Sequence, residues 1–223
     1  MNIEQVRFNM VEQQIRTWDV LDTDVLDLLH TLKRENFVPP VQREFALMDV
    51  ELPLSSNALP GTRELMWSPK MEARVAQDVD LHGFEHVLEV GTGSGYLTAL
   101  LASRSAKVTS VEINPTLAQF AVANLAKAGI TNATVETGDA ARGWTARAPY
   151  DVIVFTGSME VLPDEVLAQL KPGGKIFAIL GKPPVMRAQL ITLSFSGGRS
   201  ERTLFETVVA PLTNAALAPG FVF

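Results

Sequence analysis

The sequence contains no cysteine, which is its clearest absence. Disulfide bonds and thiolate metal sites are therefore excluded, and so is any mechanism that uses a cysteine nucleophile. Histidine is scarce as well, because His30, His82 and His86 are the only ones in the chain. With no cysteine and only these three histidines the chain has few side chains that bind zinc, so we expect no metal site.

Positive charge is also scarce. The chain has 19 basic residues against 25 acidic ones, a net charge of −6, and no cluster of lysine and arginine. Binding to a nucleic acid duplex needs a basic surface, so we expect no such partner. No window approaches the roughly 20 uninterrupted apolar residues of a membrane span. The charged start of the chain lacks the apolar core of a secretory signal. These absences predict a cytoplasmic protein that does not bind membranes.

The residues that are present suit a globular protein, because 47% of them are hydrophobic and 20% are charged. Residues 1–80 are expected to form helices and a connector that belong to, or pack on, the domain that follows. One amphipathic helix is predicted to start near Ile3, and a second over 25–32, with Asp22 or Asp24 as its cap. Residues 37–61, rich in proline and serine, predict an irregular connector.

A third helix is predicted over 68–79, with Ser68 as its N-cap and Pro69 at its first position. From His86 onward the pattern changes to short β-branched runs that alternate with helical segments. The runs are HVLEV, KVTSVE, ATVET, YDVIVFT and KIFAIL, and the helical segments are 95–103, 115–128 and 163–170. This alternation predicts an α/β domain over residues 81–223, built on a parallel sheet wrapped by helices. AQLITLS and RTLFETVVA add two strands that can pair antiparallel at its edge.

The glycine-rich stretch at 91–95, GTGSG, follows the first of these strands. Ligands of an open parallel sheet bind beyond the carboxyl ends of its strands. Glycine permits a positive φ and lets a ligand approach the backbone where a Cβ would collide. A plain tight turn, a phosphate cradle and an adenosine site are all compatible with this stretch alone.

Acidic residues at neighbouring strand ends favour the adenosine site. Glu112 lies about 20 residues after the loop, where a carboxylate can bind both ribose hydroxyls of NAD or of S-adenosylmethionine. The loop reads G-x-G-x-G rather than G-x-G-x-x-G, Glu89 can face a cationic sulfonium or amino group, and Asp139 can bind the adenine amino group. No lysine of a phosphate-binding loop follows the glycines. S-adenosylmethionine is therefore favoured, and an NAD-dependent oxidoreductase is the alternative from another class.

Each acidic residue also has a purely structural interpretation. Glu112 can cap the helix that begins near Pro115, a role that Asn114 can share. Asp139 can hold a turn, and Glu89 can pair with a lysine at the end of its strand.

Several motifs together resemble the glycine-loop methyltransferases, and more narrowly the protein-L-isoaspartate O-methyltransferase family. They are VLEVGTGSGYLTALLA (87–102), Glu112-Ile113, GDA (138–140), APYDVIVFTG (148–157) and LAQLKPGGKI (167–176). MVEQQI (10–15), FVPP (37–40) and the stretch 46–53 fit the family's lead-in. The resemblance covers almost the whole chain.

The resemblance implies a Rossmann-like methyltransferase sandwich, with a mostly parallel seven-stranded sheet, helices on both faces and an N-terminal helical region. It implies that the chain binds S-adenosylmethionine, releases S-adenosylhomocysteine, and methylates the carboxylate of L-isoaspartyl residues in damaged proteins. It implies contacts of Glu112 with the ribose and of Asp139 and Ala140 with the adenine. The other residues implied to bind the cofactor are Glu89, Gly91, Thr92, Gly93, Ser94, Gly95, Ile113 and Thr156.

One segment departs from the family pattern. The family has Gly-x-Gln-Thr-Ile-Ser-x-Pro beside the methyl-transfer centre, whereas residues 64–69 of this chain read ELMWSP. With Pro69 as the anchor, Leu65 replaces the threonine and Trp67 replaces the serine. Ser68 is then a candidate catalytic residue or only a helix cap. Leu65 and Trp67 are candidates for the acceptor pocket, although Trp67 can also be an ordinary core residue. The alternative is therefore a diverged member that binds the cofactor and methylates another small acceptor, or none.

Overall fold

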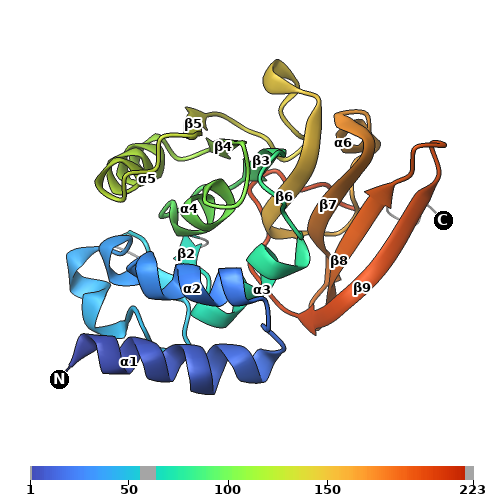
Figure 1. The fold of residues 1–223 in the computed structure, drawn as a ribbon. Coiled ribbons are helices and arrows are strands. Elements are labelled where there is room, and N and C mark those ends of the chain that lie inside the picture. The colour runs from blue at the N-terminus through green and yellow to red at the C-terminus, as the bar shows by residue number, and fades with distance from the viewer. Residues whose placement is uncertain (1, 56–63, 219–223) are drawn as a thin grey trace.

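Figure 1 shows the computed structural model, which describes residues 2–55 and 64–218. Its helical elements are α1 (Ile3–Met10), η1 (Val11–Ile15), η2 (Arg16–Trp18), α2 (Thr23–Thr31), η3 (Arg34–Asn36), η4 (Pro40–Phe45), α3 (Pro69–Asp78), α4 (Tyr96–Ala102), α5 (Pro115–Lys127), η5 (Thr145–Arg147) and α6 (Asp164–Leu167). Its strands are β1 (Leu52–Pro53), β2 (Leu65–Met66), β3 (His86–Val90), β4 (Lys107–Glu112), β5 (Ala133–Thr137), β6 (Tyr150–Met159), β7 (Leu170–Lys182), β8 (Val185–Leu193) and β9 (Arg199–Thr207).

The predicted seven-stranded sheet is confirmed, with the strand order β5-β4-β3-β6-β7-β8-β9. The strands from β5 to β7 are parallel, and β8 and β9 add antiparallel at one edge. The chain runs from β3 outward to β5 and then returns to β6 on the other side of β3. The strand order therefore reverses between β3 and β6, which is where open sheets of this kind bind their ligands.

Both faces of the sheet are covered, because successive side chains of a strand point to opposite faces. In β6, Val152 and Val154 belong to one hydrophobic cluster, whereas Ile153 and Phe155 belong to the other. Helices α3, α4 and α5 contribute to the first cluster, and α6 contributes to the second. The β-branched runs are thus strands with two buried faces.

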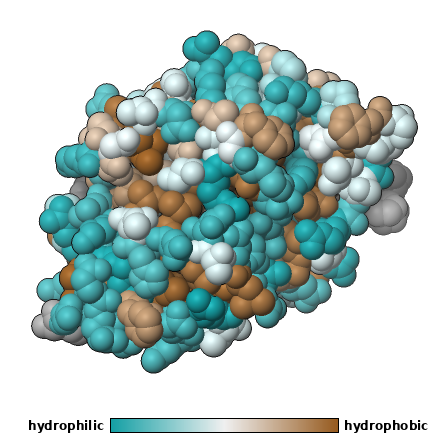
Figure 2. Space-filling view, viewed as in Figure 1, coloured by the Kyte–Doolittle hydropathy of each residue, from teal (hydrophilic) through white to brown (hydrophobic). Residues whose placement is uncertain are grey.

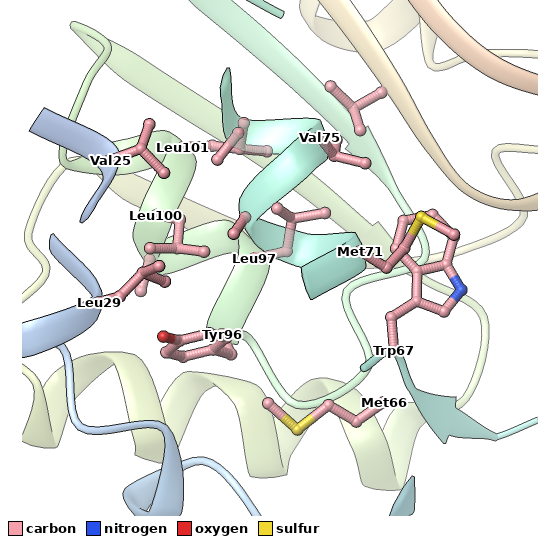
Figure 3. Close-up of a cluster of buried hydrophobic side chains, with 14 of the residues drawn as sticks. Val25, Leu29, Met66, Trp67, Met71, Val75, Tyr96, Leu97, Leu100 and Leu101 are labelled. Carbon is pink, nitrogen blue, oxygen red and sulfur yellow. The ribbon is translucent and has the colours of Figure 1, made fainter. Parts of the chain in front are cut away.

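The N-terminal helices share a core with the sheet. Asp22 rather than Asp24 caps α2, since its side chain accepts hydrogen bonds from the amides of Asp24 and Val25. Figure 3 shows residues of α2 beside α4, with Val25 and Leu29 facing the α4 leucines. The same hydrophobic cluster includes Val87 of β3, so residues on both sides of position 80 pack into one core.

Three local expectations differ from the structure. The helix expected over 163–170 is reduced to the four residues of α6, because Leu170 already pairs with Tyr150 as the start of β7. The connector contains a strand, since Leu52 of β1 pairs antiparallel with Met66 of β2. Residues 56–61 of that connector lie outside the described residues. Ser68 stands at the N-cap position of α3, but its side chain makes no capping hydrogen bond.

Hydrophobic residues on the face seen in Figure 2 lie in separate groups between hydrophilic ones. Within residues 2–55 and 64–218, no helix has the length and apolar character that a bilayer crossing requires. The described surface therefore gives no sign of a membrane-spanning helix.

Candidate functional site

A pocket lies at the carboxyl ends of β3, β4, β5 and β6, where the strand order reverses. The structure brings most of the residues singled out from the sequence into its wall. Those residues are Leu65, Trp67, Gly91, Gly93, Glu112, Ile113, Asp139, Ala140 and Thr156.

The glycine loop after β3 brings its backbone to the pocket. Gly91 has φ +94°, and a Cβ there would lie 2.2 Å from Thr156 Oγ1. Gly93 has φ +55°, and its Cβ would lie 3.2 Å from Leu54 Cδ1. The Thr156 hydroxyl lies 2.6 Å from the carbonyl oxygen of Gly91, to which it donates a hydrogen bond. The end of β6 thus fixes the loop in a conformation that favours glycine and leaves little room for side chains.

Glu112 connects this loop to the start of α5. Its Oε2 accepts the Gly93 amide at 2.9 Å, and its Oε1 accepts the Asn114 amide at 3.0 Å. Asn114 itself caps α5 by accepting the Thr116 amide at 2.9 Å. Glu112 is only 6% exposed and lines the pocket. Each carboxylate oxygen keeps a free lone pair, so Glu112 can still accept from a ligand's hydroxyl groups.

Asp139 combines a structural role with a place in the pocket wall. Its Oδ1 accepts the Ala141 amide at 3.0 Å, and its Oδ2 accepts from Asn214 Nδ2 at 2.7 Å. The side chain is exposed, whereas that of Ala140 is buried. Asp139 therefore does hold the turn at Ala141, and its acidic side chain also lines the pocket.

A second, smaller cavity lies behind the glycine loop, and Glu89, Thr92 and Ser94 line it. Glu89 is fully buried, and its Oε2 accepts hydrogen bonds from the hydroxyls of Thr98 and, at 2.6 Å, Ser110. Its Oε1 has no hydrogen-bond partner within the described part of the chain. Burial raises the pKa of Glu89 to about 8. The side chain bonds to hydroxyls, not to the lysine of the structural interpretation.

Gly95 and Ser68 lie apart from the other candidates. Gly95 begins α4 with φ +82°, and a Cβ there would meet Ala121 Cβ of α5 at 3.3 Å. Close packing between α4 and α5 therefore accounts for this glycine. Ser68 is half-buried and does not line either cavity.

The opposite wall of the pocket is a small hairpin made of β1, β2 and their flanking residues. We call residues 51–54 and 64–67 the hairpin wall. Leu54, Leu65 and Trp67 face both cavities. Trp67 is 7% exposed and belongs to the hydrophobic core, and it lines both cavities as well. Glu64 Oε1 accepts from Asn114 Nδ2 at 2.6 Å, which joins the hairpin wall to the start of α5.

Sequence reasoning missed several residues of the two cavities. Those residues include Glu51, Leu54, Glu64, Glu72 and the segment 210–213 near the C-terminus. Glu72 carried a usable signal, because it is a charged residue on the face of α3 that also presents Val75 and Val79 to the core. The segment 210–213 carried none, since it reaches the pocket only through its packing against Gly157 and Ser158.

The charge of the pocket is one-sided. Glu51, Glu64, Glu112 and Asp139 line it, and among the described lining residues there is no lysine, arginine or histidine. Such a wall favours a cationic ligand and opposes a polyanionic one. Among residues 2–55 and 64–218, no group of three or more His, Asp or Glu side chains could hold a metal ion.

Solved structures share this fold. One protein-L-isoaspartate O-methyltransferase structure has a TM-score of 0.76 at 22% identity, covering 93% of this chain and 66% of its own. A Plasmodium falciparum structure, described as a protein-L-isoaspartate O-methyltransferase in complex with S-adenosyl-L-homocysteine, has a TM-score of 0.73 at 18% identity. The match covers 96% of this chain and 99% of that one. At these identities the likeness is one of fold.

Sequence comparison gives the family. The chain is 37% identical over 180 residues to the protein-L-isoaspartate O-methyltransferase of Brucella anthropi, covering 81% of this chain and 80% of that one. It is 37% identical over 195 residues to the enzyme of the same name from Methanoculleus marisnigri, covering 87% and 85%. Residues 5–216 match the model of the family described as Protein-L-isoaspartate(D-aspartate) O-methyltransferase. The chain therefore belongs to the protein-L-isoaspartate(D-aspartate) O-methyltransferase family.

Proposed function

We propose that this protein transfers a methyl group from S-adenosylmethionine to the carboxylate of L-isoaspartyl residues in proteins. Family membership over residues 5–216 supports this activity. The main observation behind the proposal is the pocket at the reversal of strand order. The glycine backbone, the buried carboxylate of Glu112 and the exposed carboxylate of Asp139 all line this pocket.

The residues present suit S-adenosylmethionine along its whole length. The amino-acid part would lie against Gly91 and Gly93, where the loop has no side chains, with its cationic end toward the unpartnered Oε1 of Glu89. The ribose would bind Glu112, and the adenine would lie at Asp139 and Ala140. The complex of the Plasmodium falciparum relative with S-adenosyl-L-homocysteine supports this choice of cofactor.

Charge separates this proposal from the oxidoreductase alternative. NAD carries a pyrophosphate, which is doubly negative, whereas S-adenosylmethionine carries a positively charged sulfonium. The acidic side chains of the pocket would repel the first and attract the second. At the start of α4, Ser94 Oγ accepts the Tyr96 amide, so that one amide is not available to a pyrophosphate.

Methyl transfer to a carboxylate needs little acid–base catalysis from the side chains of the protein. Bound S-adenosylmethionine would supply a methyl group on a positively charged sulfur, which an oxygen nucleophile can attack. The acceptor carboxylate is ionised at pH 7, so no pocket residue has to remove a proton from it. The work of the protein is to align the acceptor and to exclude water. The apolar side chains of the hairpin wall, Leu54, Leu65 and Trp67, are suited to both tasks.

The test combines two measurements on the same protein. Calorimetry measures binding of S-adenosylhomocysteine, and a radiolabelled-methyl assay compares an isoaspartyl peptide with the matching aspartyl peptide. We expect binding, and base-labile methyl incorporation only in the isoaspartyl peptide. Binding without transfer to that peptide would contradict the acceptor, and binding of NAD in place of S-adenosylhomocysteine would contradict the cofactor.

A further inference from the structure

The smaller cavity behind the glycine loop, which we call the inner cavity, contains two buried carboxyl groups. Glu72 of α3 and Glu89 of β3 both line it, at 3% and 0% exposure. Trp67, Met66 and Leu97 form much of the remaining wall, and they lie together in the core shown in Figure 3. The cavity has a volume of about 40 Å³. A water-sized group needs only about 10–15 Å³, so a small polar group fits.

Glu72 is held in place by a buried arginine. Arg34 of η3 is fully buried and donates from Nε to Glu72 Oε2 at 3.0 Å. The same guanidinium donates to the backbone carbonyl oxygens of Ala46 and Trp67. One side chain thus fixes the Glu72 carboxylate and the hairpin wall beside it. The other carboxylate oxygen of Glu72 has no part in this ion pair.

Glu89 faces the same space without a partner for one of its oxygens. Buried carboxyl oxygens that lack a hydrogen bond are costly, and native proteins rarely keep them without a purpose. Its Oε1 is one of three such side-chain atoms within the described residues. Of these atoms, Glu89 Oε1 is the one whose residue lines the inner cavity beside the glycine loop.

We propose that Glu72 and Glu89 together receive the ammonium group of the cofactor's amino-acid part, and that its entry drives about one proton out of the inner cavity. The proposal rests on the proposed function, because it takes S-adenosylmethionine as the ligand. An ammonium group donates three hydrogen bonds, and two carboxyl groups on different elements can accept them from different directions. Glu72 is the new member of the site, since nothing in the glycine-loop motif points to α3.

The surroundings of Glu89 explain why the inner cavity holds a proton before the cofactor binds. Burial raises the pKa of Glu89 to about 8, and the carboxylates of Glu112 on β4 and Glu72 on α3 add to that rise. Burial likewise raises the pKa of Glu72 to about 7, against the opposing charge of Arg34. Tyr96 on α4 stays neutral, because burial raises its pKa.

These raised pKa values set the direction in which affinity for the cofactor changes with pH. Below pH 7 the free inner cavity holds a proton that an ammonium group would displace, because a cation favours the ionised carboxylate. Affinity for the cofactor should therefore rise with pH, by up to about tenfold from pH 6 to pH 7 when one proton is released. An α-amino group titrates near 7.7–8.0, so the ligand stays cationic over this range.

The test is calorimetry with S-adenosylhomocysteine at pH 6.5 in phosphate and in imidazole buffer, whose heats of ionisation differ. Release of a proton makes the binding heat depend on the buffer. We expect release of about one proton. The comparison ligand is 5′-methylthioadenosine, which has the nucleoside but no ammonium group and should release none.

Variants assign the effect to residues. Glu89→Gln should reduce the buffer dependence and flatten the rise in affinity between pH 6 and pH 7. Glu72→Gln should weaken S-adenosylhomocysteine about tenfold while leaving 5′-methylthioadenosine unchanged. The matched control is Glu35→Gln, which breaks another ion pair of a fully buried arginine, Arg7, at 2.6 Å and away from both cavities. It should lower stability without changing either ligand's affinity.

The outcomes separate the two proposals. S-adenosylhomocysteine that binds with no buffer dependence, and equally well to Glu72→Gln, would overturn the two-carboxyl receptor and leave the proposed function standing. Wild-type protein that binds no S-adenosylhomocysteine would overturn both. If Glu72→Gln fails to fold, the buffer comparison between wild type and Glu89→Gln still decides whether the inner cavity releases the proton.

Discussion

The two sides of the pocket are built by different means. The sheet side consists of strand ends and the turns that follow them, held by the parallel ladder and by short links such as Glu112 to Gly93. The hairpin wall depends on side chains from distant parts of the chain. Arg34 reaches the carbonyl of Trp67, and Asn114 reaches Glu64, across 33 and 50 residues of sequence.

This difference separates the two tasks of a methyltransferase. The backbone of the sheet fixes the positions at which a nucleoside can bind, so that side depends little on any one distant contact. The hairpin wall presents Leu65 and Trp67 to the pocket through a few long-range contacts, so its position depends on those contacts rather than on the parallel ladder. We therefore expect mutations on the sheet side to affect cofactor binding and mutations on the hairpin wall to affect the acceptor.

The largest effect should come from Gly91→Val on the sheet side. The new Cβ would lie 2.2 Å from Thr156 Oγ1, so the loop or the Thr156 side chain must move. We expect affinity for S-adenosylhomocysteine to fall more than about a hundredfold and unfolding free energy to fall by about 2–4 kcal/mol. Calorimetry and denaturant unfolding measure the two.

The matched control is Gly83→Val. Gly83 has the same φ of +94°, but nothing lies within 4 Å of its Cβ position. Gly83→Val should therefore lower the unfolding free energy through backbone strain alone, and it should keep its affinity for S-adenosylhomocysteine. Equal effects of the two variants would show that the loop needs glycine only for its φ angle.

A smaller loss is expected from Glu112→Ala. The variant removes a charged acceptor from the pocket and the carboxylate that holds the Gly93 amide. Each hydrogen bond to a charged group contributes about 1.5–3 kcal/mol, so S-adenosylhomocysteine should bind about 10–100-fold more weakly. The exposed Glu206→Ala on β9 serves as the control in the same titration. An unchanged affinity would mean that Glu112 acts only within the protein.

Trp67→Leu tests the other side of the comparison. We expect KM for the isoaspartyl peptide to rise about tenfold, while affinity for S-adenosylhomocysteine changes less than about threefold. Loss of a nearly buried ring should also lower the unfolding free energy by about 2–3 kcal/mol. Trp18→Leu is the control, because Trp18 is half-buried and lies outside both cavities. A large loss of cofactor affinity in Trp67→Leu would break the proposed division of the pocket.

The smallest effect concerns the link between the N-terminal helices and the sheet. Asp22 Oδ2 lies 2.7 Å from Arg104 Nη1, just beyond α4. Burial acts to raise the pKa of Asp22, but the Arg104 hydrogen bond and the amides of Val25 and Asp24 outweigh it, so the pKa lies below its ordinary value. A depressed pKa adds stability above the unfolded-state value, and that stability is lost as pH falls through the folded-state value.

Asp22→Asn keeps a good helix cap and removes only the charge. It should lower unfolding free energy by about 0.5–1 kcal/mol at pH 7. The loss should shrink toward zero as the solution is acidified below the ordinary aspartate pKa of about 3.9. Denaturant unfolding of wild type and Asp22→Asn at pH 7 and at acid pH measures the difference in unfolding free energy. A difference that does not shrink in acid would show that the ion pair is not its cause.

The difference between the sheet side and the hairpin wall also explains which features could be predicted from the sequence. Strand runs such as KVTSVE, the glycine loop and the spacing to Glu112 are local patterns, and the structure puts Gly91, Gly93, Glu112 and Asp139 at one pocket. The antiparallel edge strands were likewise visible as β-branched runs. Periodicity and strand-end rules act over short distances, which is why they succeed here.

Long-range packing explains what the sequence could not predict. The β1–β2 pairing joins Leu52, inside the Pro- and Ser-rich connector, to Met66 beyond it, and no local sequence pattern indicates this pairing. The approach of Leu212 to Gly157 depends on how the chain returns after β9. Glycine has several uses, so the sequence could not separate Gly95, which packs on Ala121, from Gly91 and Gly93 at the pocket.

A crystal structure of the protein with S-adenosylhomocysteine is the most direct test of how the pocket holds its cofactor. We expect the amino-acid part of the ligand to lie against Gly91 and Gly93, with its ammonium group between Glu72 and Glu89. The ribose hydroxyls should lie within hydrogen-bond distance of Glu112, and the adenine beside Asp139, with Leu65 and Trp67 facing the sulfur. A ligand that left Glu112 without a contact, or that lay outside the reversal between β3 and β6, would contradict this expectation.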